Sequence, residues 1–376
     1  MAEGYEGKIG IKEQYNGWGN AAVLPGIGVF EPDSANPDTG IVQNRRSSKI
    51  RGQRNVAPAN VTKDFANPTS EFTIQPRVLE MIPLLMSHYQ CVEVVNGTNI
   101  SGNLIVGTFR FAPANRTPDS SGNSWGTFWS PSGAGGGGTA FSVSAGDFYP
   151  LTIEVGVGTI SDTAPEAQFV FPNGYVEQMS WEQEWDGDLM VTARLNHRGQ
   201  DVSSSLFVGS ANFGTNTKSS NLRFAGWTGT VTVDGTSNST LDVESWSMET
   251  NNAGRGRGRI GQYGFGRFTF QDAEQTGEIG LEFKDYSQYK AMLDDNTFPV
   301  KMRWEDANQA EWIQVDQYNC KYRPTNPSIT GDSSIDISYP YEAFESNGTP
   351  AVIVSVFGSY SPTLLSVDLS AGSART

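Results

Sequence analysis

The 376-residue sequence is poor in the residues on which most enzymes and metalloproteins depend. It contains two histidines, His88 and His197, and two cysteines, Cys91 and Cys320. The cysteines lie far apart and match no metal-ligand spacing, so we expect buried thiols and no disulfide framework. We expect each histidine to be packed or solvated, because no Gly-x-Ser-x-Gly nucleophile motif and no phosphate-binding glycine loop occurs. The sequence therefore predicts that the protein is not an enzyme and that it has no catalytic residue, cofactor or metal.

Basic residues are also scarce. Lys and Arg number 26 against 41 Asp and Glu, which gives a formal net charge of −15. Binding of DNA phosphates depends on Lys and Arg, so we do not expect a DNA-binding surface. No apolar run approaches the roughly 20 residues of a membrane-spanning helix, and residues 1–6 lack the features of a signal peptide. We expect a protein that is made and folds in the cytoplasm without membrane insertion.

What the sequence does have is the pattern of many short strands. Glycine is abundant, with 42 residues, and charged residues make up only 18%. Apolar residues alternate with polar ones in several segments, which indicates strands with one buried face. The clearest segment, 175–195, predicts a long hairpin with its turn at Asp186-Gly187 and with Trp181 and Trp185 on the core side. The other alternating sets are Phe72/Ile74, Ile279/Leu281/Phe283, Val300/Met302/Trp304 and Ile335/Ile337/Tyr339.

Only two segments have helical spacing. The first covers residues 78–86, follows Pro76, and should be kinked or shortened by Pro83. The second covers residues 286–293 and follows Asp285, a good N-cap residue. Residues 113–140 and 200–222 are rich in Gly, Ser and Asn and are expected to be surface loops.

The two helical segments also indicate an internal duplication. A strand leads into each of them, at residues 71–77 and 278–284, and an arginine-rich stretch precedes each strand. We therefore predict an all-β protein with one short helix per domain, in which two similar β-sandwich or barrel domains arose by duplication. The domains are expected at 1–200 and 223–345, with a C-terminal extension at 346–376 that adds a strand to the body or to a neighbour. The alternative is that any strand-to-helix junction would look this similar.

Two further patterns each allow two interpretations. Acidic residues near tryptophans at 181–186 resemble a glycosidase cleft, but Glu182 and Glu184 have the opposite parity to the tryptophans and so favour a solvated strand face. The Gly-Arg alternation of residues 254–259 resembles segments that bind single-stranded nucleic acid. In so acidic a chain it favours loops that contact acidic surfaces on neighbouring subunits. The candidate inter-subunit residues are Arg45, Arg46, Arg51, Arg255, Arg257 and Arg259.

Residues 4–13 and 251–306 carry a family resemblance. In the second segment a basic, glycine-rich loop leads into a strand pair at 268–283, then a short helix and a strand at 300–304. This arrangement is similar to the tail tube (major tail) proteins of long-tailed bacteriophages. The resemblance implies a structural virion protein, with a β-sandwich or barrel flanked by a helix and a long loop, that is assembled in the host cytoplasm. Its subunits would form stacked rings around a hollow conduit, together with tape-measure and tail-tip proteins.

An acidic channel wall would let DNA slide through without specific binding. The candidate lumen-facing acids are Glu182, Glu184, Glu278, Glu282 and Asp336. A true duplication would give trimeric rings with pseudo-sixfold symmetry, and without it hexameric rings are expected. The competing function is a carbohydrate-binding or receptor-binding β-sandwich module, which the nine tryptophans suggest.

Overall fold

The structure is a computed structural model that describes part of the chain. The described residues are 8–13, 29–30, 34–36, 41–45, 61–65, 68–89, 92–99, 105–113, 127–130, 139–142, 151–157, 167–197, 224, 228–237, 242–258, 265–269, 273–282, 290, 296–306, 311–323, 336–346 and 350–360.

Antiparallel strands dominate the described residues, which confirms the predicted all-β class. Most of the strands join one sheet. Its strands are β1 (Lys8–Glu13), β2 (Val29–Phe30), β3 (Ser34–Asn36), β6 (Thr69–Ile74), β7 (Val92–Asn99), β8 (Ile105–Phe111), β11 (Leu151–Val157), β12 (Ala167–Glu184), β13 (Met190–Asn196), β14 (Gly229–Val233), β15 (Thr236–Ser237), β16 (Val243–Asn251), β19 (Glu274–Glu282), β20 (Phe298–Glu305), β21 (Trp312–Tyr322), β22 (Asp336–Ala343) and β23 (Val352–Tyr360). Separate two-stranded ribbons are β4 (Ile41–Arg45) with β5 (Val61–Phe65), β9 (Thr127–Ser130) with β10 (Thr139–Ser142), and β17 (Arg255–Gly258) with β18 (Phe265–Thr269).

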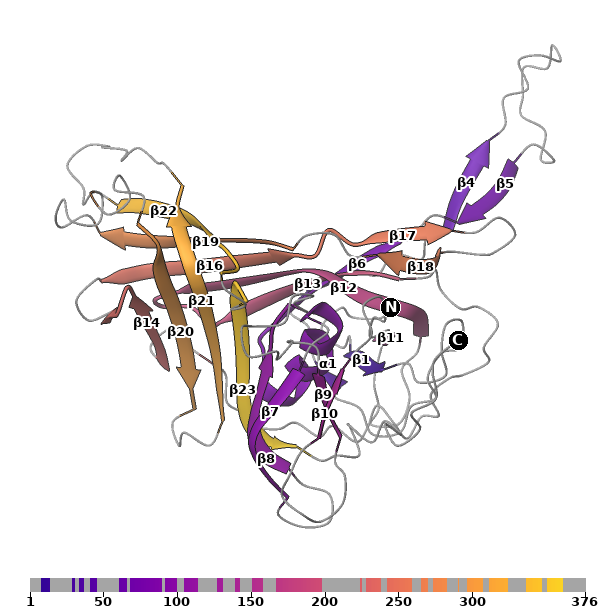
Figure 1. Ribbon diagram of the computed structural model, residues 1–376. Coiled ribbons are helices and arrows are strands. Elements are labelled where there is room, and N and C mark those ends of the chain that lie inside the picture. Colours follow the sequence, from indigo (N-terminus) through magenta and orange to yellow (C-terminus); the bar gives the residue numbers. More distant parts are fainter. Residues whose placement is uncertain are drawn as a thin grey trace.

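The sheet contains two groups of strands that run in different directions (Figure 1). In the first group, which we call the long sheet, the order is β3-β6-β13-β12-β16-β19-β22. In the second group the order is β14-β20-β21-β23-β8-β7. The core joins the groups: Trp246 of β16 and Trp304 of β20 are buried, with ring centroids 5.6 Å apart.

The predicted alternation matches the burial at the described positions of four of the predicted strands. Strand β20 buries Phe298, Val300, Met302 and Trp304 on one face. The other predicted core positions that are buried are Phe72, Ile74, Ile279, Leu281, Ile337 and Tyr339. Phe283 and Ile335 lie outside the described residues. Alternation is reliable here because successive side chains of a strand point to opposite faces.

The predicted hairpin is formed by β12 and β13. The two strands pair from Tyr175↔Asn196 to Glu182↔Met190, and Trp181 and Leu189 are fully buried. The prediction that Trp185 belongs to the core is wrong, because its side chain is 68% exposed. Trp185 follows the last residue of β12 and lies in the turn, where the strand alternation no longer applies.

Helix α1 (Val78–Tyr89) confirms the first predicted helix, and it packs against β12 and β23. Pro83 does not shorten it, since the helix continues to Tyr89. A proline inside a helix removes one intrahelical hydrogen bond. Leu84, Leu85 and Met86, which follow Pro83 in the helix, are buried, so their tertiary packing maintains the helix beyond the proline. The second predicted helix, 286–293, lies outside the described residues apart from Lys290.

The two strands of the proposed repeat are part of one sheet. β6 and β19, which contain the two copies of the proposed repeat, are separated in the long sheet by β13, β12 and β16. The duplication and the domain boundaries remain predictions. The C-terminal extension contributes β23, which pairs with β21 and β8 of the same chain. Part of the segment 113–140 forms the β9–β10 ribbon, whereas 200–222 lies outside the described residues.

Candidate functional site

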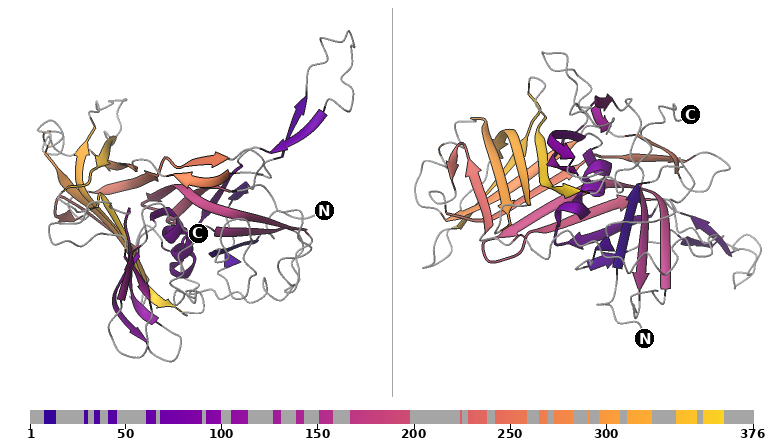
Figure 2. Two further views of the ribbon diagram at one scale, coloured as in Figure 1. Left: turned by 45° about the vertical axis from the view of Figure 1, so that its right-hand side comes forward. Right: turned by 90° about the horizontal axis from the view of Figure 1, so that it is seen from below.

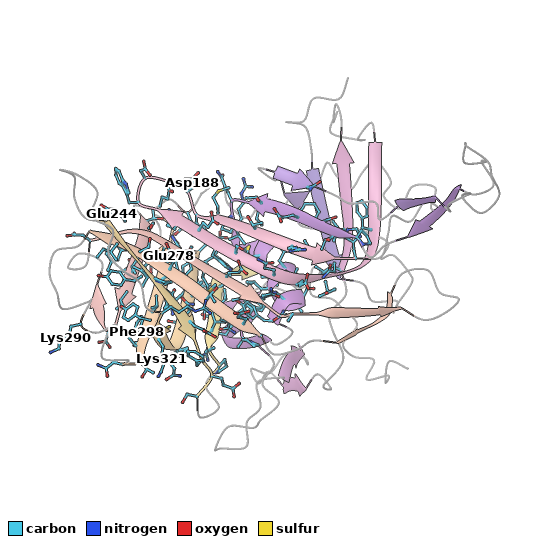
Figure 3. The ribbon with its side chains drawn as sticks, turned by 90° about the horizontal axis from the view of Figure 1, so that it is seen from above. Asp188, Glu244, Glu278, Lys290, Phe298 and Lys321 are labelled. Carbon is cyan, nitrogen blue, oxygen red and sulfur yellow. The ribbon has the colours of Figure 1, made fainter. Side chains whose placement is uncertain are left out.

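One face of the long sheet covers the core and the other carries polar side chains. On the polar face, exposed carboxylates occupy alternate positions of four strands, and we call this surface the acidic face. It consists of Glu71, Glu182, Glu184, Glu249, Glu274 and Glu278, with small polar residues between them. Figure 3 looks down on β12, β16 and β19 lying side by side, with Glu278 on β19 and Glu244 near the start of β16.

The strand register spaces these acids apart. Ser247 of β16 stands between Glu182 of β12 and Glu278 of β19, so the two glutamates are two strand spacings apart, roughly 10 Å. Glu249 is likewise flanked by Ser180 and Thr276. Like charges directly opposite each other would destabilise the sheet. The register therefore concentrates negative charge on one face without placing two of these exposed carboxylates directly side by side.

The basic residues described on this face lie next to acids. Arg194 of β13 pairs in register with Glu71 of β6. At the β22 side, Arg323 forms an ion pair with Glu342 at 2.9 Å and approaches Glu274 at 3.8 Å. These neighbours reduce the positive potential that the arginines present to solvent. The face as a whole is negative.

Three of the five acids predicted for the lumen, Glu182, Glu184 and Glu278, are exposed on the acidic face. Glu282 and Asp336 are paired in register at one end of β19 and β22. Sequence reasoning missed Glu71, Glu249 and Glu274. The parity of Trp246 and Met248, which are buried, would have identified Glu249 as a residue of the opposite face.

The outer strands of the long sheet are only partly covered. β22 pairs with β19 along its length, but with β21 only at Tyr341–Ala343. Pro340 has no N–H, so Pro340 and Glu278 form a non-hydrogen-bonded pair of the antiparallel ladder. The Pro340 carbonyl oxygen accepts a hydrogen bond from the Arg323 N–H at 2.7 Å. Residues 336–338 have no second strand partner among the described strands. On the opposite side, the three residues of β3 are the only described residues that pair with the outer edge of β6.

The arginine-rich segments were expected to be loops and are instead two-stranded ribbons where they are described. Arg45 ends β4, while Arg255 and Arg257 lie on β17. Figures 1 and 2 show the β4–β5 ribbon projecting from the main body, with the β17–β18 ribbon on the same side of the molecule. Arg46, Arg51 and Arg259 lie outside the described residues.

Both histidines are buried, as packed side chains, and each joins separate elements. His88, near the end of α1, places Nε2 2.6 Å from Thr250 Oγ1 and Nδ1 3.2 Å from the Val176 carbonyl oxygen. Burial lowers the pKa of His88 to about 4, although the hydrogen bond to Val176 opposes the shift. His197 Nε2 lies 2.6 Å from Ser70 Oγ. The contacts of His88 attach α1 to the long sheet, and the contact of His197 joins the end of β13 to β6.

The other reactive side chains also have structural surroundings. Cys320 is a buried free thiol, and burial raises its pKa to about 12, which keeps it protonated and unreactive. Cys91 lies outside the described residues. In the described part of the chain, no three His, Cys, Asp or Glu side chains are grouped so that they could bind a metal ion.

The described helix is too short to cross a membrane.

Comparison with known families places these elements in context. A family model described as phage tail tube protein matches residues 95–343, about two thirds of the chain. The match includes β12, β16 and β19, with most of the acidic face, and the β17–β18 ribbon. A search of curated proteins gave no match.

Proposed function

Since the chain belongs to the phage tail tube protein family, we propose that its subunits self-assemble into stacked rings that form the tail tube. Membership of the family makes it a structural component of the virion tail. The proposed tube is the hollow conduit through which DNA passes into the host. Assembly would take place in the host cytoplasm, together with tape-measure and tail-tip proteins.

The acidic face is the observation that carries this proposal. It is a surface of carboxylates and small polar side chains that spans several strands, on the side of the long sheet that does not cover the core. DNA close to such a surface is repelled, whereas Lys and Arg would bind phosphates and slow its passage. We assign this face to the lumen, with Glu182, Glu184, Glu278, Glu282 and Asp336 among the lining residues.

The partly covered outer strands supply a means of closing a ring. Residues 336–338 of β22 on one side, and β3 with β6 on the other, can extend the sheet into neighbouring subunits. Pairing of unlike edges is a heterologous contact, which closes into a ring when the rotation fits. Pro340 would limit such pairing to the residues before it, because it has no N–H to donate.

The arginine ribbons supply contacts between subunits. We assign Arg45, Arg46, Arg51, Arg255, Arg257 and Arg259 to these contacts, with acidic surfaces of neighbouring chains as their partners. The net charge of −15 provides many such surfaces. An exposed ion pair contributes only about 0.2–1 kcal/mol, but each contact is repeated around every ring and along the tube.

Ring symmetry depends on the duplication. If residues 1–200 and 223–345 are two copies of one domain, three chains present six similar domains and the rings are trimeric with pseudo-sixfold symmetry. If they are not, hexameric rings are the alternative. The measured mass of an isolated ring distinguishes the two.

Negative-stain microscopy of the purified protein tests the proposal. We expect rings or hollow tubes whose inner wall carries acidic side chains. A strictly monomeric mass at high concentration, with no tubes after prolonged incubation, would contradict it. The competing carbohydrate-binding function predicts a stable monomer that binds a glycan array, but Trp181, Trp246 and Trp304 are buried and cannot serve as exposed sugar platforms.

A further inference from the structure

Trp185 is an exposed aromatic side chain on a firmly held turn. It is 68% exposed, and among the described residues only Phe344, at 40%, is another large exposed hydrophobic side chain. The Trp185 N–H donates to the Glu244 carbonyl at 2.9 Å, which fastens the β12–β13 turn to the start of β16. A fixed, exposed tryptophan is the kind of side chain that dominates protein interfaces.

Acidic residues are the neighbours of this tryptophan, two of them in the sequence and the third through the backbone hydrogen bond to Glu244. Glu184, Asp186 and Glu244 are exposed beside it, and no ion pair links any of them to a described Lys or Arg. We call Glu184, Trp185, Asp186 and Glu244 the Trp185 turn. An aromatic face bordered by negative charge favours arginine, which stacks on the ring and pairs with carboxylates at the same time.

The chain itself contains such a contact elsewhere. The Arg303 guanidinium carbon lies 4.3 Å from the centre of the Trp312 ring, and Arg303 also forms an ion pair with Glu305. An arginine placed between a tryptophan and a carboxylate is therefore an arrangement that this fold already uses. The Trp185 turn offers the tryptophan and the carboxylates without the arginine.

The β17–β18 ribbon offers arginines without carboxylates. Its register pairs Arg257 with Arg267 and Arg255 with Thr269, so three arginines occupy positions on one face of the ribbon. Two arginines directly opposite each other destabilise a strand pair, and an isolated two-stranded ribbon is only marginally stable. A partner that supplies negative charge would stabilise this ribbon.

The turn and the ribbon lie at opposite ends of β16. Glu244 is near the start of this strand, and Arg255 follows its last residue, Asn251, by four positions. Nine strand residues span roughly 30 Å, and Figure 1 shows β17 and β18 beyond the far end of β16. The two surfaces of one chain are therefore too far apart to bind each other. In two copies placed head to tail they can meet.

We propose that the Trp185 turn of one subunit binds the β17–β18 ribbon of a second copy, with an arginine over the indole ring and the others against Asp186 and Glu244. The contact is heterologous, so it continues from subunit to subunit into a ring or a filament. The proposal rests on the proposed self-assembly and names one of its contacts.

Two variants that each lack one surface test this contact. Trp185→Ala removes the aromatic ring of the Trp185 turn, and the triple variant R255S/R257S/R267S removes the arginines of the β17–β18 ribbon. Each variant alone should remain folded by circular dichroism, because the substituted residues are surface or ribbon residues, and should raise the critical concentration for assembly at least about tenfold. Phe344→Ala is the matched control for loss of an exposed aromatic, and K290S/K301S is the control for loss of exposed positive charge. Both controls should assemble like the wild type.

Mixing the two variants provides the decisive measurement. One intact turn and one intact ribbon remain in the mixture, so sedimentation should reveal a complex of one copy of each that does not grow further. Raising the salt concentration should dissociate this complex. Normal assembly of Trp185→Ala, or a mixture that stays monomeric, would overturn the contact while leaving tube formation intact. A wild-type protein that never assembles would overturn both the contact and the proposed function.

Discussion

Gly277 of β19 and Tyr341 of β22 are paired directly across the long sheet, and the phenol ring of Tyr341 lies against the glycine where a Cβ would otherwise stand. Tyr341 is fully buried. Its hydroxyl accepts a hydrogen bond from Trp246 Nε1 at 3.0 Å and donates one to Gln317 Oε1 at 2.6 Å. This tyrosine thus connects β16 and β22 of the long sheet to β21 of the second group.

Replacing Gly277 by Ala should destabilise the protein. The added methyl group would overlap the Tyr341 ring, and overpacking of this kind costs about 1–3 kcal/mol. Chemical denaturation measures the effect. Gly187→Ala is the control, because a Cβ there would meet Glu184 Cβ at an ordinary 3.6 Å. Equal stability of the two variants would show that Tyr341 can move aside.

Replacing Tyr341 by Phe should cost about 1–3 kcal/mol of unfolding free energy, since the buried Trp246 N–H would lose its acceptor. The ring itself is kept, so packing changes little. Tyr322→Phe is a matched control: it keeps the stack on Phe298, with centroids 4.0 Å apart, and no side-chain hydrogen bond of Tyr322 is described. A smaller loss for Tyr341→Phe than for the control would contradict the proposed importance of the hydrogen bonds.

The stability of the protein should fall in acid partly through His88. Its pKa is about 4 in the folded protein and about 6.5 when unfolded, because burial disfavours the charged imidazole. The unfolded chain therefore binds the proton first. The contribution of His88 is fully present above pH 6.5 and is lost as the pH falls toward 4, by about 3 kcal/mol in all.

The measurement is the free energy of unfolding against pH for the wild type and for His88→Gln. The variant should be less stable at pH 7 and should show a smaller loss between pH 6.5 and 4. Identical slopes for the two proteins would mean that His88 takes up its proton without unfolding. Carboxylates contribute to both curves equally, so the difference between them isolates the histidine.

The acidic face should decide how the protein responds to DNA. Changing Glu182, Glu249 and Glu278 to Lys should leave the fold intact, because all three are exposed. The variant should bind DNA with an affinity that falls steeply as salt rises. The same three residues changed to Gln provide the control, since they lose negative charge without gaining phosphate-binding groups. Binding by the Gln variant, or none by the Lys variant, would count against an electrostatic role of this face.

The sequence by itself determined the fold class and most of the core. Alternation placed Trp181, Ile279, Val300 and Tyr339 inside, because the direction of a strand side chain depends only on its position in the strand. It also placed Glu182 and Glu278 on the outer face. From the charge balance we expect this outer surface to repel DNA, which remains a prediction. Alternation is a local property of each strand and net charge is a sum over the chain, so both can be predicted without knowing which strands pair in the folded protein.

The tertiary structure decided what local pattern could not. Trp185 has the parity of the core, but the strand ends one residue before it and the turn exposes the ring. Pro83 was expected to kink or shorten the helix, but buried contacts maintain the helix to Tyr89. The acidic face exists because β12, β16 and β19 pair in a register that brings Glu182, Glu249 and Glu278 onto one surface. Strand neighbours and register are set by long-range packing and turn geometry, and for that reason only the folded chain shows them.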